Sequence, residues 1–262
     1  MSHFLDLHRP GQPLLMPNPW DAGSARVLAA LGFQALATTS SGFAATLGRA
    51  DMSVTREEAI GHAAAIVAAV DVPVSADLEN GFSDDPSGVA KTVKKAVAAG
   101  LAGCSIEDHT QRDDDPIYHA GLAAERVAAA VDVAGHDLVI TARAENFLHG
   151  RPDLADTIAR LQSYQEAGAH VLYAPGLTSA DEIRTVVKSV DRPVNVLALA
   201  AAPPVAELAE LGVARISVGG AFAFAALGAL VDAGRELLEQ GTYGFWQRAK
   251  PGREIAGAAF GG

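Results

Sequence analysis

The chain has 262 residues, of which 49% are hydrophobic, sufficient for the core of one large domain or two small ones. Its 20 Lys and Arg against 31 Asp and Glu give a formal net charge of −11, which excludes nucleic acid and anionic membranes as expected partners, because both bind basic patches. The single cysteine, Cys104, excludes an internal disulfide and indicates a reducing cytoplasm. The N-terminus lacks the features of a signal peptide, and the most membrane-like run, residues 216–231, is too short to span.

One unit recurs along the chain: a short apolar strand, a polar strand end and an amphipathic helix rich in alanine. Thr55 and Glu58 predict a capping box at the start of the helix after the second strand. The expected strands are residues 14–17, 35–39, 72–77, 103–107, 138–142, 170–173, 193–197 and 214–218, and the expected helices are residues 21–31, 56–70, 86–99, 122–133, 152–167, 179–190, 204–211 and 221–239.

These repeated pairs of strand and helix predict a closed (β/α)8 TIM barrel of the α/β class. An open, doubly wound sheet uses the same alternation, but it rarely needs so many evenly spaced units. No linker, low-complexity block or break in composition separates a second domain. We therefore expect a single barrel domain over residues 1–241 and a short glycine-rich C-terminal tail over residues 242–262, which is a candidate contact between subunits.

Polar and charged residues gather where the expected strands end. In a (β/α)8 barrel the C-terminal ends of the strands form the active-site face, and the opposite ends here are mostly apolar. This contrast favours an enzyme over a structural protein. The residues at the C-terminal ends are Asn18, Thr39, Ser40, Ser41, Asp77, Glu79, Glu107, Asp108, Arg143, Glu145, Tyr173, Asn195, Ser217 and Gly219.

Asp77, Glu79 and Glu107 are candidate metal ligands. Side chains alternate along a strand, so Asp77 and Glu79 are expected on one face, and Glu107 ends the neighbouring strand about 5 Å away. Three oxygen donors without His or Cys predict Mg²⁺, with Mn²⁺ as the other candidate. We expect one direct carboxylate ligand and contacts through water for the others. The alternative for each acid is a helix cap or a pair with a surface base.

Arg143, at the end of the fifth strand, can hold a substrate carboxylate through two parallel hydrogen bonds. The alternative is a salt bridge to Glu107 or Glu145 that organises the site without touching substrate. Residues 39–41 supply hydroxyl and N–H groups suited to a carboxylate or enolate oxygen, but an ordinary loop start explains them equally well. Residues 217–220 offer backbone amides to a phosphosugar, although a tight turn is the favoured explanation.

Five segments, in chain order, carry a family resemblance: residues 17–26 (PNPWDAGSAR), 38–42 (TTSSG) with Leu47, Gly48 and Asp51, 77–82 (DLENGF), 105–108 (SIED) and 142–145 (ARAE). Together they resemble the isocitrate lyase/phosphoenolpyruvate mutase superfamily, and most of all its small bacterial phosphonomutase-like members. The resemblance extends over nearly the whole expected barrel. It implies a barrel that is usually tetrameric, exchanges a C-terminal helix between subunits and uses Mg²⁺ on 2-oxo acids.

The resemblance also implies roles for residues of this chain. It makes Asp77 the direct metal ligand, with Glu79 and Glu107 acting through metal-bound water. Arg143 and the backbone of residues 39–41 would hold the substrate. Trp20 and Asp51 would line the pocket. With the strand-end residues added, the catalytic candidates are Asp51, Glu107, His109 and Arg143. The substrate-binding candidates are Trp20, Thr39, Ser40, Ser41, Arg143, Tyr173 and Asn195.

The expected loop after the fourth strand, residues 108–120, departs from the family pattern. Lyases of the family carry Lys-Lys-Cys-Gly-His there, with the cysteine as proton donor or acceptor, and mutases carry a lysine and an asparagine. This loop has neither cysteine nor lysine, Cys104 lies within a strand, and Tyr173 stands where mutases have a histidine. The candidates for the general acid or base are His109, His119 and Tyr173.

We therefore expect a Mg²⁺-dependent lyase that cleaves a C–C bond in a small 2-oxo or 2-hydroxy carboxylic acid through an enolate intermediate. One alternative is a phosphoenolpyruvate or phosphonopyruvate mutase or hydrolase that acts on a P–C bond. Another is a protein that binds a 2-oxo acid without turnover. The expected partners are a small carboxylate substrate and other copies of the chain, in a dimer or tetramer.

Overall fold

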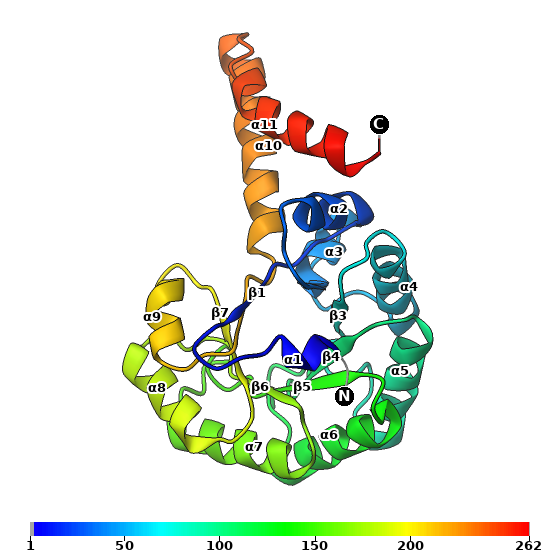
Figure 1. Cartoon of the computed structure of the whole chain (residues 1–262), viewed down its shortest axis with the longest axis vertical. Coiled ribbons are helices and arrows are strands. Elements are labelled where there is room, and N and C mark those ends of the chain that lie inside the picture. Colours follow the sequence, from blue (N-terminus) through cyan, green and yellow to red (C-terminus); the bar gives the residue numbers. More distant parts are fainter. Residues whose placement is uncertain (1–2, 262) are drawn as a thin grey trace.

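Eight parallel strands form a nearly closed barrel, which confirms the predicted (β/α)8 TIM barrel (Figure 1). The computed structural model describes residues 3–261. Hydrogen-bonded strands follow the order β1-β8-β7-β6-β5-β4-β3-β2, and the Ala37 N–H donates to the Pro17 carbonyl oxygen, 3.1 Å away, across the junction between β1 and β2. The strands are β1 (Leu14–Met16), β2 (Leu36–Ala37), β3 (Val74–Asp77), β4 (Gly103–Glu107), β5 (Val139–Arg143), β6 (Val171–Tyr173), β7 (Val194–Leu197) and β8 (Arg215–Ser217).

The predicted helices are present, and local caps define their starts. At the first turn of α4 the Thr55 hydroxyl accepts from the Glu58 N–H at 3.3 Å, and the Glu58 carboxylate accepts from the Thr55 N–H at 2.8 Å. The predicted capping box is therefore confirmed. The helices that match the predicted set are α2 (Ala22–Ala30), α4 (Arg56–Val67), α5 (Pro86–Ala98), α6 (Ala120–Ala134), α7 (Leu154–Glu166), α8 (Ala180–Ser189), α9 (Val205–Glu210) and α10 (Ala221–Gln240).

Three further helices, α1 (His3–Asp6), α3 (Ser40–Thr46) and α11 (Phe245–Ala259), are not in the predicted set. α3 begins directly after Thr39, whose side-chain oxygen accepts from the Gly42 N–H at 3.3 Å, in a stretch expected to be a loop. The glycine-rich tail after Gly241 is largely helical. Gly241 ends α10 in the left-handed conformation (φ 64°), and α11 follows it.

Helix α1 closes the barrel at the end opposite the C-terminal ends of the strands. The Phe4 ring is buried there with Leu14, Val139 and Val171. A Cβ atom at Gly103 would lie 2.8 Å from this ring, so the glycine provides the space that the ring fills. The closed floor leaves the C-terminal ends of the strands as the open face of the barrel.

Apolar clusters between the strands and the outer helices hold the strand ends in place. In one cluster Ile66 of α4 and Val93 of α5 are fully buried, and in the other Leu161 of α7 and Val186 of α8 are fully buried. Burial of such side chains contributes about 1.5–3 kcal/mol each, which fixes the helices against the sheet. The polar residues at the strand ends are therefore presented by a rigid scaffold.

Helix α10 extends away from the barrel, and α11 folds back from its far end onto α2 (Figure 1). Several large apolar side chains of α10 are exposed in the single chain, so this helix has an apolar surface without a partner in residues 3–261. None of the helices described has both the length and the apolar character needed to cross a membrane. The exposed apolar residues of α10 are Phe222, Phe224, Leu227, Leu230, Val231, Leu237 and Leu238.

Candidate active site

A cavity of about 140 Å³ lies at the C-terminal ends of the strands and continues into the barrel. Its wall is rich in hydroxyl, amide and charged side chains, as a site for a small polar substrate requires. It brings together most of the residues predicted to bind substrate. The predicted residues that line it are Thr39, Ser40, Ser41, Asp51, Asp77, Arg143, Tyr173 and Asn195.

Arg143 lies at the centre of this site and contacts three carboxylates. Its Nη1 is 3.0 Å from Asp77 Oδ1, its Nη2 is 3.1 Å from Glu107 Oε2, and its Nε is 2.7 Å from Glu145 Oε1. The Tyr173 ring lies below the guanidinium, 5.3 Å from ring centroid to Cζ. Burial alone would lower the pKa of Arg143, but Glu145, Glu107 and Asp77 raise it well above its usual value. The salt bridges considered as an alternative from sequence are therefore present.

The acids outnumber the positive charge that Arg143 supplies. Burial raises the pKa of Glu107 well above its ordinary value, against the opposing effect of Arg143, and burial also raises the pKa of Glu145. Burial, followed by repulsion from Asp77, raises the pKa of Glu79 to about 8. A cation among these groups would favour their ionised forms.

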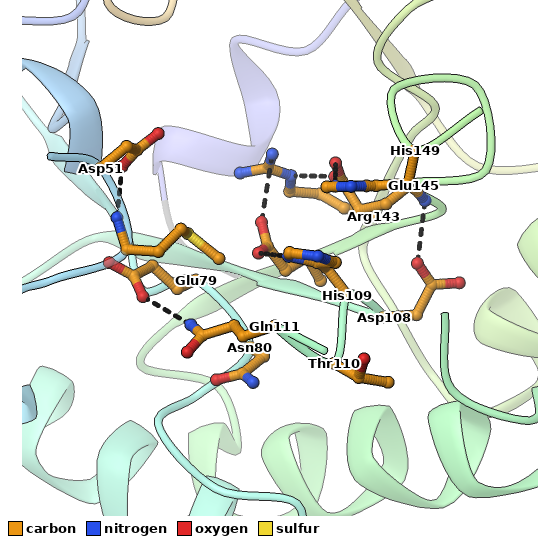
Figure 2. A network of polar contacts seen from close by, with 12 residues as sticks. Asp51, Glu79, Asn80, Asp108, His109, Thr110, Gln111, Arg143, Glu145 and His149 are labelled. Atoms are coloured by element: carbon orange, nitrogen blue, oxygen red, sulfur yellow. Dashed lines mark hydrogen bonds and ion pairs between the residues drawn. The ribbon is translucent and has the colours of Figure 1, made fainter. Parts of the chain in front are cut away.

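Glu79 departs from the predicted alternation. Strand β3 ends at Asp77, and Glu79 follows in the left-handed region (φ 49°), so its carboxylate turns to Gln111, whose Nε2 donates to Oε2 at 2.9 Å. Figure 2 shows this contact on the opposite side of the site from Arg143. Within residues 3–261, no three or more His, Cys, Asp or Glu side chains form a group that could hold a metal ion as they stand. Asp77 and Glu107 meet at Arg143, and Glu79 stands apart from them.

The donors present nevertheless fit a hard cation. Glu79 Oε1 is buried and has no hydrogen-bond partner among the described residues. The Asp77 side chain is 18% exposed and faces the cavity, so its oxygens can reach a bound ion. Carboxylate oxygens without a thiolate among them are the ligands that Mg²⁺ and Mn²⁺ prefer.

Two histidine rings lie over the carboxylates. His109 and His149 stack with ring centroids 3.7 Å apart, as Figure 2 shows. His109 Nδ1 is 3.8 Å from Glu107 Oε1, and His149 Nε2 is 3.9 Å from Glu145 Oε2. Burial, then His149 and Arg143, lower the pKa of His109 to about 4. His109 is thus placed beside the acids as predicted, and His149 joins it from the loop after β5.

The other two candidates for the general acid or base differ in position. His119 is the N-cap of α6, and its Nδ1 accepts from the Gly121 N–H at 3.3 Å. Its ring therefore caps this helix. Tyr173 lines the cavity, and burial raises its pKa to about 12. A phenol with so high a pKa is a hydrogen-bond donor at neutral pH.

Asn18 accepts hydrogen bonds from backbone amides of residues 217–220, the segment considered for a phosphosugar. Its Oδ1 accepts from the Val218 N–H at 3.0 Å and from the Gly219 N–H at 2.9 Å, and its Nδ2 donates to the Thr38 carbonyl oxygen at 2.9 Å. The turn after β8 therefore ties β8 to β1 and β2. This favours the tight-turn explanation over a phosphosugar site.

Trp20 and Asp51, both expected to line the pocket, lie in different places. Asp51 lines the cavity, and burial followed by repulsion from Asp77 raises its pKa. Trp20 instead lines a separate apolar cavity of about 230 Å³ with Ala223 and Leu227 of α10. In the single chain Trp20 is therefore set apart from the polar site.

The chain is similar to known proteins over most of its length. A model of the phosphoenolpyruvate phosphomutase family matches residues 4–238. The chain belongs to the isocitrate lyase/phosphoenolpyruvate mutase superfamily. The 2-methylisocitrate lyase of Escherichia coli strain K12 is 30% identical, over 76% of this chain and 74% of that protein. The family predicted from the five segments is confirmed, and the superfamily member described here is an enzyme of the lyase and mutase type.

Two solved structures extend the comparison. A candidate lyase/mutase of Burkholderia cenocepacia J2315 is 53% identical, with a TM-score of 0.93 over 99% of this chain and 94% of that one. A phosphonopyruvate hydrolase in complex with oxalate and Mg²⁺ has a TM-score of 0.83 over 95% and 91% of the two chains. Since the hydrolase is 24% identical, that likeness shows the fold alone.

Proposed function

We propose that this superfamily member is a Mg²⁺-dependent lyase that cleaves a C–C bond in a small 2-oxo or 2-hydroxy carboxylic acid through an enolate. The observation that carries the proposal is the surplus of carboxylates: Asp77, Glu107 and Glu145 share one guanidinium, and Glu79 keeps an unpartnered buried oxygen. Burial raises the pKa of Glu79, Glu107 and Glu145, and further positive charge nearby would favour their ionised forms. The hydrolase of the same fold binds Mg²⁺ and oxalate, which resembles the enolate of pyruvate.

Asp77, Glu79 and Glu107 would hold the ion, with Mn²⁺ as a substitute, because their oxygens are hard ligands. When bound, a divalent cation polarises the substrate oxygens and stabilises the negative charge of an enolate.

Arg143 keeps donors for the substrate although three carboxylates contact it. A guanidinium has five N–H donors, and three ion pairs leave others free to orient a substrate carboxylate. Thr39, Ser40 and Ser41 line the same cavity. Thr39 Oγ1 and Ser41 Oγ are 3.2 Å apart, so one hydroxyl hydrogen of this pair can donate to a substrate oxygen. These contacts align the bond that breaks.

We assign the proton transfer to His109, whose Nδ1 lies 3.8 Å from Glu107 Oε1. With its pKa lowered to about 4 its ring is neutral at neutral pH, and its Nδ1 is buried without a hydrogen-bond partner among the described residues. It can accept the proton of a 2-hydroxyl group as the C–C bond breaks and return it to the enolate carbon. Asp51, which lines the cavity and whose pKa is raised by burial, is the second candidate to carry a proton.

The proposal is tested by product formation from oxaloacetate, 2-methylisocitrate and 2,3-dimethylmalate, with and without Mg²⁺. Turnover is expected to need the metal and to fall below detection in Asp77→Ala. The control Asp114→Ala, in an exposed part of the loop after β4, should keep wild-type turnover. Metal-independent turnover, or full activity in Asp77→Ala, contradicts the proposal.

P–C chemistry is the second candidate, because the matching family model describes a phosphomutase. The same carboxylates and Arg143 would then serve a phosphonopyruvate or phosphoenolpyruvate substrate. Phosphorus-31 spectra of phosphonopyruvate incubated with the enzyme and Mg²⁺ separate the two: a new phosphorus signal favours the mutase or hydrolase, and an unchanged spectrum favours the lyase.

A protein that binds a 2-oxo acid without turnover is the third candidate. The loop after β4 has neither the cysteine of the family's lyases nor the lysine of its mutases. A protein that only binds its ligand needs neither residue. Tight binding of oxalate with Mg²⁺, together with no product from any 2-oxo acid tested, would favour binding over catalysis.

A further inference from the structure

Arg215, the first residue of β8, lies inside the barrel and is 3% exposed. It lines the same cavity as Arg143. Its Nη1 contacts Thr141 Oγ1 at 3.1 Å and His8 Nε2 at 3.3 Å. Thr141 precedes Arg143 on β5, and His8 belongs to the N-terminal segment that leads from the floor into β1. Arg215 is therefore deeper in the barrel than Arg143.

The contacts of Arg215 leave its charge unpaired. The His8 Nδ1 is 3.0 Å from the Phe4 carbonyl oxygen, which can only accept, so Nε2 accepts from Arg215 and the ring is neutral. Thr141 is also neutral, and no carboxylate among the described residues forms a salt bridge with Arg215. The Nε of Arg215 is buried and has no hydrogen-bond partner within residues 3–261.

A buried guanidinium without an anion is unusual, because removing a charge from water is costly unless the charge is paired. Burial, partly offset by Tyr173, lowers the pKa of Arg215 to about 10, so the group is still charged at neutral pH. The contrast with Arg143, which contacts three carboxylates, is direct. One arginine of the cavity contacts three carboxylates, and the other contacts none among the described residues.

The surroundings of Arg215 in the cavity also offer hydrogen bonds to an anion. Ser217 and Tyr173 line the cavity beside it, and the Asn195 Nδ2 donates to Ser217 Oγ at 2.9 Å. Ser217 and Tyr173 are also hydrogen-bonded to each other, so one hydroxyl hydrogen of this pair remains available to an anion. The floor of the cavity therefore combines a charged donor with a hydroxyl donor.

We infer that Arg215 binds a second carboxylate of the substrate inside the barrel, while Arg143 and the proposed divalent cation engage the carboxylate next to the reacting carbon. The inference rests on the proposed function, since it assumes a carboxylic acid in this cavity. It makes Arg215 the residue that selects substrates with two carboxylates over those with one.

Calorimetric titration with malate and 2-hydroxybutyrate, both with Mg²⁺, tests this inference. The two acids have the same carbon chain, and a methyl group in 2-hydroxybutyrate replaces the distal carboxylate of malate. Wild-type protein is expected to bind malate about 10–100-fold more tightly, as charged hydrogen bonds allow. Arg215→Gln keeps a polar side chain near Thr141 and His8 but should bind the two acids with equal affinity. Arg215→Lys should keep part of the preference.

The control Arg9→Gln removes an exposed positive charge outside the cavity and should keep the wild-type preference. Equal affinity in wild-type protein, or an unchanged malate preference in Arg215→Gln, overturns the inference and leaves the proposed function intact. Binding of neither acid by wild-type protein contradicts both. A crystal structure of wild-type protein with Mg²⁺ and malate, which needs no variant to fold, should place the distal carboxylate about 3 Å from Arg215 Nε. A distal carboxylate outside the barrel contradicts the assignment.

Discussion

At the scale of single residues, the site depends on how buried charges are balanced. Arg143 is shared by Asp77, Glu107 and Glu145, and removal of its charge would leave these acids facing each other in a buried space. Loss of one partner from a buried ion cluster is far more costly than its net contribution, because the remaining charges stay desolvated. Arg143 therefore supports the folded state as well as the chemistry.

Arg143→Gln is expected to reduce the free energy of unfolding by about 3–5 kcal/mol. Urea unfolding followed by circular dichroism measures this loss, and added Mg²⁺ should recover part of it by replacing the missing positive charge. The matched control Arg184→Gln breaks the surface pair with Asp181 and should have a much smaller effect. A loss no larger than that of the control would contradict this account of the cluster.

His8 gives the fold a dependence on pH. Burial and then Arg215 lower its pKa from 6.5 to about 3, so the folded state requires the neutral ring. The unfolded chain binds the proton more readily, and the stabilisation is therefore complete above about pH 6.5 and is lost as pH falls toward 3. Wild-type protein should lose about 2 kcal/mol more than His8→Gln between pH 7 and pH 5.

Urea unfolding of wild-type protein and His8→Gln at the two pH values measures this difference. Comparison with the variant is needed because Glu79, whose pKa is raised to about 8, contributes with the opposite sign: its stabilisation is lost as pH rises. His136→Gln, at an exposed position, is the control and should follow the wild type. Equal pH dependence in wild type and His8→Gln would show that His8 is not held neutral.

At the scale of elements, α6 holds the loop that carries Glu79. The buried Arg126 donates from Nη1 to the carbonyl oxygens of Ser83 and Asp84, at 2.7 and 3.1 Å, and from Nη2 to that of Asn80. Its guanidinium also lies 4.0 Å from the centroid of the Tyr118 ring. One arginine thus fixes the turn in which Glu79 adopts its left-handed conformation.

Arg126→Met keeps most of the packed stem but leaves these carbonyl oxygens without their donors, which is expected to cost about 3 kcal/mol of stability. Hydrogen exchange of residues 79–84 should become faster while exchange in α7 and α8 is unchanged. Arg112→Met, at the exposed contact to Asp84, is the control and should leave exchange near wild type. Unchanged protection of the loop in Arg126→Met would contradict the role given to α6.

The sequence predicts the elements well where periodicity carries the information. All the strands and the cap at Thr55 are found, because apolar runs and capping residues act locally. Helix α3 is not predicted, because residues 40–46 have little of the apolar periodicity of a helix. The helix is instead defined by its cap at Thr39. The position of Glu79 was missed because no glycine or asparagine marks its positive φ. Arg215 is not predicted, because it starts β8, whereas a barrel's active-site residues are expected at the C-terminal ends of the strands.

At the scale of the whole molecule, the exposed apolar side chains of α10 suggest assembly. Their number on one projecting helix exceeds the scattered exposure common on monomers. We propose that this surface packs against other copies of the chain in a dimer or tetramer. The neighbouring apolar cavity at Trp20, Ala223 and Leu227 is the second part of the same surface.

Light scattering after size-exclusion chromatography should give a dimer or tetramer for wild-type protein. Leu230→Glu, which places a charge at a 66% exposed position of α10, should shift the species to a smaller assembly without unfolding the barrel. Val133→Glu, at an exposed position of α6, is the control and should not change the mass. A monomeric wild type would contradict the proposal.

Calorimetric titration of wild-type protein with Mg²⁺ in the presence of oxalate tests the central claim most directly. Asp77, Glu79 and Glu107 should take up the ion at a single class of sites, and Asp77→Ala should lose this uptake while the barrel stays folded. If wild-type protein takes up no Mg²⁺, or Asp77→Ala binds it with unchanged affinity, the acids do not form a metal site and the proposed lyase chemistry fails.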